Sequence, residues 1–432
     1  MNDTRRLDKY GAKPSGAGLG VKPRTSRREF LGASLASAAA ASAVRALASP
    51  TSGEPAAPHP HTRVLDRQAL EDILVGCSYL GCGGGGRLAE GTARLADDLK
   101  SGLRFELLAV VDLGDDEWAA SPYGLGSNAP PTEMEKSRFA DLPPAPGDAV
   151  ELSFRALSAF LHRPFVAAIA GELGPWSTAA ALSTAARLKI ATLDADRVGR
   201  ATPEATQDSI LTAGLSTVPL AAVTVFGDSL ILEKVARGSR VEDLLRAVSV
   251  ASLGDLGVTD AALSGRDARR PGVLVVGSIS HAEALGKAAR RAIAAHANPI
   301  DAVIAAGSGY RLFEGAVLDF PWKDEAGFLA GEVAMAGRGA FAGSRYRVQY
   351  QNENIISWRD DQVSVAPPDL IAIADSRTGA AIANPDFQRG QLVTVLGFPA
   401  PAIWRTPAGL KVFGPAHFGF DIPYVPVEQR QR

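Results

Sequence analysis

The sequence predicts an α/β fold in two domains, an N-terminal α/β domain with a largely parallel sheet over residues 62–232 and a C-terminal β-rich domain over residues 233–425. The apolar run Phe165–Ala170 precedes a glycine turn and a helical stretch, which is the strand–turn–helix unit of a parallel sheet. The run Lys189–Leu193 repeats the strand. After Leu232, short β-like runs alternate with Gly, Asp and Pro, as in a domain made mostly of strands.

Residues 1–48 contain the parts of a twin-arginine export signal. The pair Arg27-Arg28 precedes the short apolar stretch Phe30–Val44, and the small-x-small sequence Ala46–Ala48 follows. These parts in this order are typical of a secretory leader, and paired arginines select the route for folded proteins. The stretch is too short and too weakly apolar to span a bilayer, which needs about 20 apolar residues. We expect a periplasmic or secreted protein, cleavage near Ala48, the twin-arginine translocase as a partner and no stable membrane span.

Charge and composition restrict the partners. The chain holds 45 Lys/Arg and 47 Asp/Glu, and the leader accounts for nine and three of them, so the mature chain has 36 basic and 44 acidic residues and a net charge near −8. A negative chain without a basic stripe argues against nucleic acid as a partner and favours a small-molecule substrate. Residues 49–61, with four prolines, predict a disordered tether. Whether the protein forms a homo-oligomer is left open.

The order of elements in the N-terminal half follows from apolar spacing. Asp66 is placed to cap a helix that ends at Gly81, and residues 104–112 predict a strand. Pro122–Pro131, rich in Gly and Pro, predicts a long irregular loop. Ser177 is expected to cap a helix that runs to Leu188.

In the C-terminal half the pattern predicts one long helix and several strands. The helix is expected over His281–His296, and the expected strands are Tyr346–Tyr350, Leu370–Ala374, Leu392–Leu396 and Gly409–Phe413. No fixed-period repeat occurs, which argues against a solenoid or a propeller.

A glycine-rich loop, Gly81–Gly86, is the least ordinary segment. Consecutive glycines accept positive φ and expose backbone N–H groups, so Gly83, Gly84 and Gly85 could wrap a substrate oxygen. The same N–H groups would lower the pKa of Cys82 and make it a candidate nucleophile. Alternatively, the loop passes close beneath another element and Cys82 is a small apolar filler. A disulfide between Cys77 and Cys82 is a minority alternative.

Acidic residues follow the two predicted parallel strands. The candidate catalytic residues are Asp194, Asp196 and Glu204, and Glu172 and Arg200 are candidate substrate-binding residues. If the strands are neighbours, these groups meet at the sheet edge where ligands collect. There they could act as general acid and base, bind a divalent metal or bind a polar heterocycle. Taken singly, each of these residues is more often a helix cap or a member of a solvated ion pair.

Asn352 and Glu353 follow a predicted strand and suit recognition of a ring amide, with a polar turn as the simple alternative. Zinc-protease, zinc-ribbon, α/β-hydrolase and P-loop motifs are missing from the sequence, which argues against those classes.

Six segments, in order, resemble the S-methyl thiohydantoin desulfurase domain family, which is associated with hydantoinase and oxoprolinase-type genes. They are Leu80–Gly86, Asp194–Glu204, Gly277–Ser280, Gln351–Glu353, Pro368–Ile371 and Gly414–Gly419. The resemblance covers nearly all of the chain after Asp66. It implies a two-domain protein whose relatives remove sulfur from a five-membered thiohydantoin ring by hydrolysis. It carries over to the glycine loop with Cys82, to Glu172, to Asp194–Glu204 and to Asn352-Glu353. The chain departs from the family pattern at Gly174–Ser177, where the bulky Trp176 would reshape or close a pocket.

The resulting hypothesis is a hydrolase of hydantoin-like or thiohydantoin-like rings. The N–H groups of the glycine loop would stabilise the developing anion, and the acidic residues would transfer a proton or hold a metal-bound water. A rival hypothesis is a non-catalytic periplasmic binding or partner protein of the same fold. A third is a cofactor-bearing protein, because folded export often serves cofactor loading. The sequence specifies neither the metal nor any other cofactor.

Overall fold

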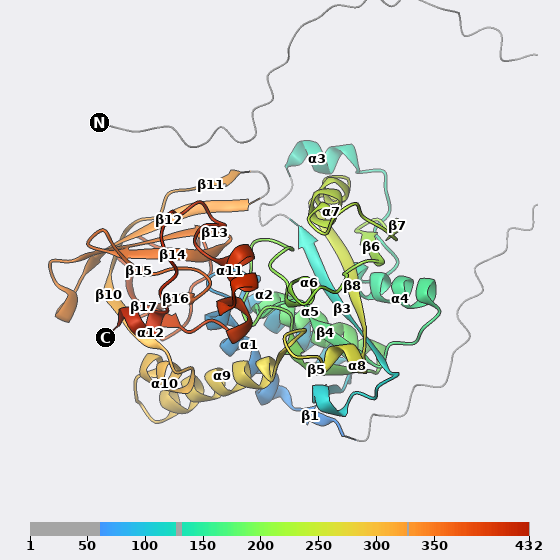
Figure 1. Ribbon diagram of the computed structural model, residues 1–432, viewed down its shortest axis with the longest axis horizontal. Coiled ribbons are helices and arrows are strands. Elements are labelled where there is room, and N and C mark those ends of the chain that lie inside the picture. The colour runs from blue at the N-terminus through green and yellow to red at the C-terminus, as the bar shows by residue number, and fades with distance from the viewer. Residues whose placement is uncertain (1–60, 127–131, 326–327, 432) are drawn as a thin grey trace, which may run out of the picture. The chain divides into compact units, whose positions relative to one another are not determined.

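The computed structural model describes residues 61–126, 132–325 and 328–431. The predicted leader and all of the tether except His61 lie outside these residues, as do the last five residues of the predicted Pro122–Pro131 loop. The described part of the chain contains two β-sheets with helices around them (Figure 1).

The first sheet confirms the expected α/β domain. Its strand order is β1-β2-β5-β4-β3-β8-β6-β7, with β9 paired to β5. The pairs β2/β5, β4/β5 and β3/β4 at its centre are parallel, and the other pairs are antiparallel. The strands are β1 (Arg63–Leu65), β2 (Phe105–Leu108), β3 (Trp118–Gly126), β4 (Ala167–Ala170), β5 (Ala191–Asp196), β6 (Leu220–Thr224), β7 (Ser229–Leu232), β8 (Asp255–Ser264) and β9 (Val275–Val276).

The second sheet confirms the β-rich domain. It is antiparallel, with strand order β15-β14-β13-β12-β10-β17-β16 and β11 paired to β12. Its strands are β10 (Tyr310–Asp319), β11 (Trp322–Glu325), β12 (Phe328–Gly337), β13 (Arg345–Gln351), β14 (Glu353–Arg359), β15 (Gln362–Val365), β16 (Leu370–Asp375) and β17 (Leu392–Phe398).

The helices of the first domain and of the connection to the second come in one run along the chain. They are α1 (Arg67–Leu80), α2 (Leu88–Lys100), η1 (Val110–Asp112), α3 (Glu133–Arg138), α4 (Ala149–Leu161), α5 (Pro175–Leu188), α6 (Ser209–Thr212), α7 (Arg240–Val250), α8 (Gly265–Ala268), α9 (Ser278–Ala294) and α10 (Pro299–Ala306). Short helices of the second domain are η2 (Gly339–Phe341), η3 (Ala402–Arg405), α11 (Pro407–Phe413) and α12 (Val427–Arg430).

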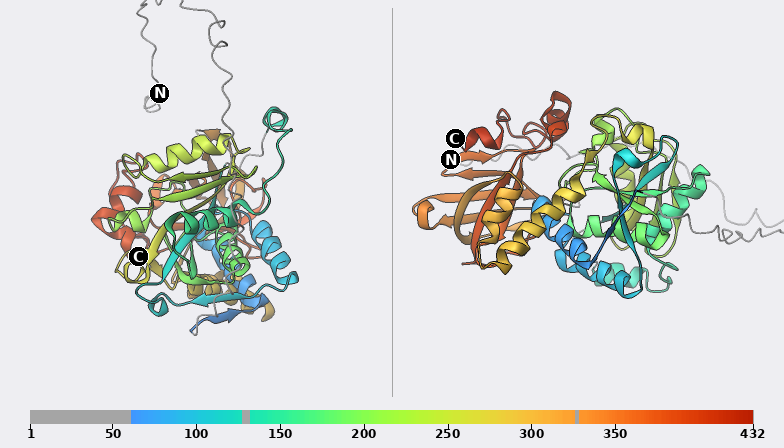
Figure 2. Two further views of the ribbon diagram at one scale, coloured as in Figure 1. Left: turned by 90° about the vertical axis from the view of Figure 1, so that its right-hand side faces the viewer. Right: turned by 90° about the horizontal axis from the view of Figure 1, so that it is seen from below.

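Helices α1 and α9 connect the two sheets. They lie side by side in the views of Figures 1 and 2, and α1 also contacts α5 of the first domain and β16 of the second. Their backbones approach closely at two glycines: a Cβ added to Gly76 would lie 1.8 Å from the carbonyl oxygen of Ala282, and one added to Gly286 would lie 1.9 Å from that of Asp72. One hydrophobic core therefore spans both domains, with Leu74 and Leu370 among its members.

The first sheet takes in strands from beyond the expected boundary. β8 and β9 follow residue 233, yet they pair with β3, β6 and β5 of the first sheet. The two sheets therefore separate in the sequence between β9 and β10, because long-range pairing and not chain order decides sheet membership.

Four sequence predictions about elements are wrong at least in part. Of the strand predicted over residues 104–112, only Phe105–Leu108 form β2, and Val110–Asp112 form the short helix η1. Residues 122–126 belong to β3, because they pair with β8 and do not form a loop. Residues 409–413 lie in α11, which Thr406 caps by accepting from the N–H of Gly409 and which Pro407 begins. Helix α5 begins at Pro175 with Gly174 as its N-cap, three residues before the predicted cap Ser177. The predicted Asp66 cap is confirmed, since its carboxylate accepts from the N–H of Ala69.

Candidate functional site

A cavity of about 740 Å³ contains residues of both domains in its lining. The first domain contributes the end of the glycine loop, the turn after β4, the segment after β5 and the C-terminal end of β3, and the second domain contributes Asn352 and Glu353 at the start of β14. Residues lining it from the expected site are Gly85, Glu172, Glu204, Asn352 and Glu353. The glycine loop and the acidic segment after β5 therefore meet at one cavity.

The glycine loop is shaped by close contacts with its surroundings. Gly85 and Gly86 have φ of +68° and +84°, in the left-handed region that favours glycine. The carbonyl oxygen of Gly85 accepts hydrogen bonds from the N–H groups of Trp176 (3.0 Å) and Ser177 (3.3 Å), so it caps the start of α5. A Cβ on Gly84 would lie 1.8 Å from Oε1 of Glu353. Glycine is therefore required here for close approach, as one of the two sequence interpretations proposed.

Glu172 follows β4 and is hydrogen-bonded through both carboxylate oxygens. The Ser177 hydroxyl donates to Oε1 (2.8 Å), and the N–H of Thr202 donates to Oε2 (2.9 Å). Burial raises the pKa of Glu172, although these two hydrogen bonds and the charges of Arg200 and Arg197 oppose the shift. The carboxyl group is thus fixed in position by donors that favour its ionised form.

Glu353 is 3% exposed, and its Oε2 atom has no hydrogen-bond partner. Burial, followed by the charge of Glu172, raises the pKa of Glu353 well above its usual range, while Arg200 and the backbone of Gly85 oppose the shift. Two carboxyl groups close enough to influence each other do not both ionise readily. We conclude that Glu353 holds a proton more strongly than Glu172 does.

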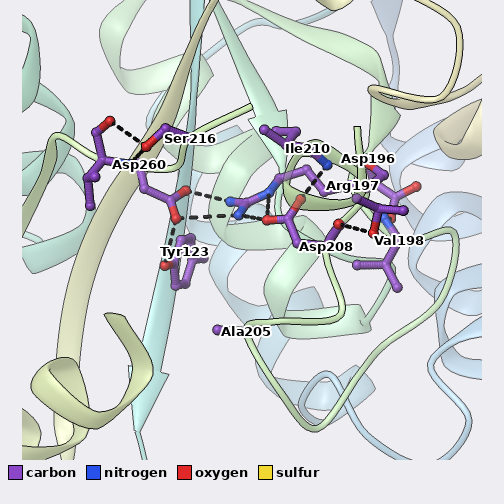
Figure 3. Close-up of polar contacts among 12 residues, drawn as sticks. Tyr123, Asp196, Arg197, Val198, Ala205, Asp208, Ile210, Ser216 and Asp260 are labelled. Carbon is purple, nitrogen blue, oxygen red and sulfur yellow. Dashed lines mark hydrogen bonds and ion pairs between the residues drawn. The ribbon is translucent and has the colours of Figure 1, made fainter. Parts of the chain in front are cut away.

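A buried ion-pair network forms another part of the wall (Figure 3). Arg197 donates from Nε to Asp208 (3.0 Å) and from Nη1 to Asp260 (2.5 Å), and the Tyr123 hydroxyl donates to Asp260 (3.1 Å). Burial raises the pKa of Asp260 to about 6, although Arg197 opposes the shift. Tyr123, Arg197 and Asp208 line the cavity. Sequence reasoning missed this network, and the one signal for it was a charged residue, Asp260, within the apolar run of β8.

Asp194 and Asp196 lie inside β5 and not beyond its end, and neither lines the cavity. Asp194 accepts hydrogen bonds from the N–H (2.9 Å) and the hydroxyl (2.6 Å) of Ser280, at the start of α9. Asp196 is fully buried and accepts from the N–H groups of Val198 (2.9 Å) and Gly199 (2.6 Å). Burial, with a smaller contribution from the charge of Glu172, raises its pKa to about 7. Both aspartates occupy structural positions, because β5 pairs with β9 up to its last residue.

Cys82 and Arg200 are buried away from the cavity lining. The Cys82 thiol contacts the carbonyl oxygen of Leu80 (3.3 Å), and burial raises its pKa, so the predicted lowering by loop N–H groups is wrong. Cys77 and Cys82 are both free. Arg200 donates to backbone carbonyl oxygens of Ala201, Asn354, Pro368 and Asp369, and thereby connects the domains.

The remaining predicted residues divide between wall and scaffold. Glu204 lies 3.0 Å from Nε2 of His417, and so contacts the second domain near the cavity. Asn352, with φ of +57°, uses its side-chain oxygen to accept from the N–H of Leu329 (2.8 Å), which fixes the turn before Glu353. Gly83 packs against Asn384, whose Nδ2 would lie 2.5 Å from an added Cβ.

Trp176 does not close the cavity but forms part of its wall. Its ring lies over Gly124 and its Cβ over Gly86, where added Cβ atoms would lie 2.5 Å and 2.3 Å from it. Within the described ranges, groups of three or more His, Cys, Asp or Glu side chains placed to hold a metal ion are absent. A helix long and apolar enough to cross a membrane is likewise absent from the part of the chain that the structure describes.

These features define a class of protein: an α/β domain joined to an antiparallel β domain, with the half-buried Glu172 of the first domain and the buried Glu353 of the second at a shared cavity. Comparison with family models identifies the family. The model described as S-Me-THD-like, N-terminal domain, matches residues 68–234, and the S-Me-THD-like, C-terminal domain, matches residues 236–427. The chain belongs to the S-methyl thiohydantoin desulfurase-like family, as the sequence resemblance implied.

Among solved structures, the chain is similar to the crystal structure of a protein from Chromobacterium violaceum. The TM-score is 0.68 with 22% sequence identity, over 84% of this chain and 100% of that one. At this identity the likeness shows the fold alone. The comparison with curated proteins found no match.

Proposed function

We propose that the protein hydrolyses a hydantoin-like or thiohydantoin-like ring, and that S-methyl thiohydantoins are its best substrates. The observation that carries the proposal is the pair Glu172 and Glu353, a half-buried and a buried carboxyl group from different domains that line one cavity. The pKa of Glu353 is raised well above its usual range by burial and by the charge of Glu172. Paired carboxyl groups of unequal pKa are the usual equipment for general acid and base catalysis. The family supports the ring substrate.

In the proposed reaction, Glu172 acts as the base. Its carboxylate takes a proton from water, and the water oxygen forms a bond to the ring carbon that bears the S-methyl group. Both Glu172 oxygens keep a free lone pair, since each accepts a single hydrogen bond from the protein. Thr202 and Ser177 hold the carboxylate in place while it receives the proton.

Glu353 acts as the acid. As the carbon–sulfur bond breaks, its carboxyl proton passes to the leaving sulfur, so that methanethiol and the hydantoin are released. The proton taken by Glu172 then restores Glu353 through solvent. Glu353 suits this role because burial and the charge of Glu172 raise its pKa well above the usual range, which favours its protonated form, and because its Oε2 atom is without a protein partner.

The deciding experiment incubates the purified mature protein with hydantoin, 2-thiohydantoin and 2-methylthio-imidazol-4-one. Thiol release is followed with a chromogenic disulfide, and ring loss by absorbance. We expect methanethiol release from the S-methyl ring that depends on enzyme concentration. Thermal stabilisation by the rings without turnover, with or without added divalent cations, would instead support the binding-protein alternative.

We also propose that the protein acts outside the cytoplasm, after export by the twin-arginine translocase and cleavage near Ala48. The support is the sequence of residues 1–48, in which an arginine pair, a short apolar stretch and a small-x-small site follow one another.

A further inference from the structure

The segment after β5 contains a buried amide whose nitrogen has no partner. Gln207 is 0% exposed and lines the cavity. Its Nε2 atom makes no hydrogen bond in the structure. Buried donors in folded proteins nearly always have a hydrogen-bond partner, so an unpaired one calls for a specific explanation, such as a ligand that completes it.

The other end of the amide is fixed, which settles its orientation. Oε1 of Gln207 accepts from the backbone N–H of Glu204 (3.2 Å) and from the hydroxyl of Thr202. Since the backbone N–H can only donate, the atom facing it must be the oxygen, and the unpaired atom must be the NH₂ group.

Gln207 is also linked to the proposed base. Thr202 donates its hydroxyl proton to Gln207 and its backbone N–H to Glu172 (2.9 Å). The same short segment therefore positions the carboxylate that would activate water and contributes Gln207, with its unpaired donor, to the lining of the same cavity. A substrate carbonyl oxygen held by that donor would place the ring relative to Glu172.

We propose that Gln207 is a specificity-determining residue that donates a hydrogen bond from Nε2 to the exocyclic carbonyl oxygen of a cyclic amide substrate. This inference rests on the proposed function and adds to it the group that recognises the ring. The enzyme should therefore prefer rings in which one ring nitrogen joins the reacting carbon to a carbonyl carbon. Rings without that carbonyl leave the buried donor unpaired.

The test combines two substrates with two variants. The substrates are 2-methylthio-imidazol-4-one and 2-methylthio-2-imidazoline, which lacks the carbonyl, and both release methanethiol. The measured quantity is the ratio of their kcat/KM values. Intrinsic reactivity cancels when this ratio is compared between wild type and variant.

The variants separate the donor from the packing of the segment. Gln207→Glu keeps an oxygen for Thr202 and for the Glu204 N–H but loses the NH₂ donor, whereas Gln207→Met loses both. We expect both variants to lower the ratio by roughly 5- to 100-fold relative to wild type. Thermal unfolding of each variant checks that it is folded.

The possible outcomes separate the role of Gln207 from the proposed hydrolase activity. A Gln207→Glu protein that keeps the wild-type ratio would overturn the role of Gln207 while leaving the hydrolase standing. Failure of the wild type to release methanethiol from either ring would overturn the proposed function and, with it, this assignment.

Discussion

Glu172 and Glu353 stand 181 positions apart in the sequence and in different domains, yet the charge of Glu172 is the largest electrostatic contribution to the raised pKa of Glu353. Their environments differ in a way that assigns roles. Glu172 accepts hydrogen bonds at both oxygens, and Glu353 has an oxygen without a partner. General acid and base catalysis by this pair would depend on that difference.

Replacing either glutamate by glutamine should abolish most of the activity. General acid and base groups contribute roughly 100- to 10,000-fold, so we expect kcat to fall by that factor in Glu172→Gln and in Glu353→Gln. Glu353→Gln should keep or raise the melting temperature, because it removes an ionisable group from a buried site. Glu332→Gln, on the second sheet in an ion pair with Arg347, serves as the control and should retain wild-type kcat. Equal activity in all three variants would contradict the assignment.

The glycine loop should be intolerant of a methyl group at Gly84. A Cβ there would overlap Oε1 of Glu353, so Gly84→Ala should displace the proposed acid and lower kcat by roughly 100-fold. Gly147→Ala is a matched control, since its Cβ would meet only ordinary contacts with Leu152 at 3.9 Å. Steady-state methanethiol release measures both. Similar rates in the two variants would mean that Glu353 is not held where the structure places it.

Removing the buried arginine should unfold the first domain more easily. Arg197→Met leaves Asp208 and Asp260 as buried acids without their cation, and loss of one partner from a buried ion pair costs about 3–5 kcal/mol. Adding Asp260→Asn should recover part of this loss, because it removes one of the two uncompensated charges. Urea unfolding of the single and double variants measures the difference. A double variant less stable than Arg197→Met would argue against a mainly electrostatic role.

Stability should fall as pH rises through neutrality, in part because of Asp196. Burial raises its pKa from the ordinary aspartate value of 3.8 to about 7, so the folded state binds the proton more tightly than the unfolded chain. The resulting stabilisation is fully present below the unfolded pKa and is lost as pH rises through about 7. Asp196→Asn keeps an oxygen for the Val198 and Gly199 N–H groups, so its melting temperature should change less than that of wild type between pH 5 and 8. Melting temperatures that change equally with pH in wild type and Asp196→Asn would refute this.

The leader can be tested independently of the enzyme. Changing Arg27 and Arg28 together to lysine should retain the protein in the cytoplasm with its leader uncleaved, because the translocase reads the arginine pair. Cell fractionation with a terminal epitope tag shows where the protein is, and N-terminal sequencing of the exported form should begin near Ser49. Export of the double variant at the wild-type level would remove the twin-arginine route.

Local chemistry in the sequence was enough to predict the α/β class, the β-rich second half, the Asp66 cap and the family. These features depend on apolar periodicity, capping residues and ordered motifs, which neighbouring residues determine. Only the tertiary structure decided that β8 returns to the first sheet, that Asp194 and Asp196 serve the scaffold and that Glu172 meets Glu353. The sequence likewise did not predict the roles of Gln207 and the Arg197 network. Which polar groups line the cavity depends on burial and on pairing between residues far apart in the sequence, which a local pattern does not specify.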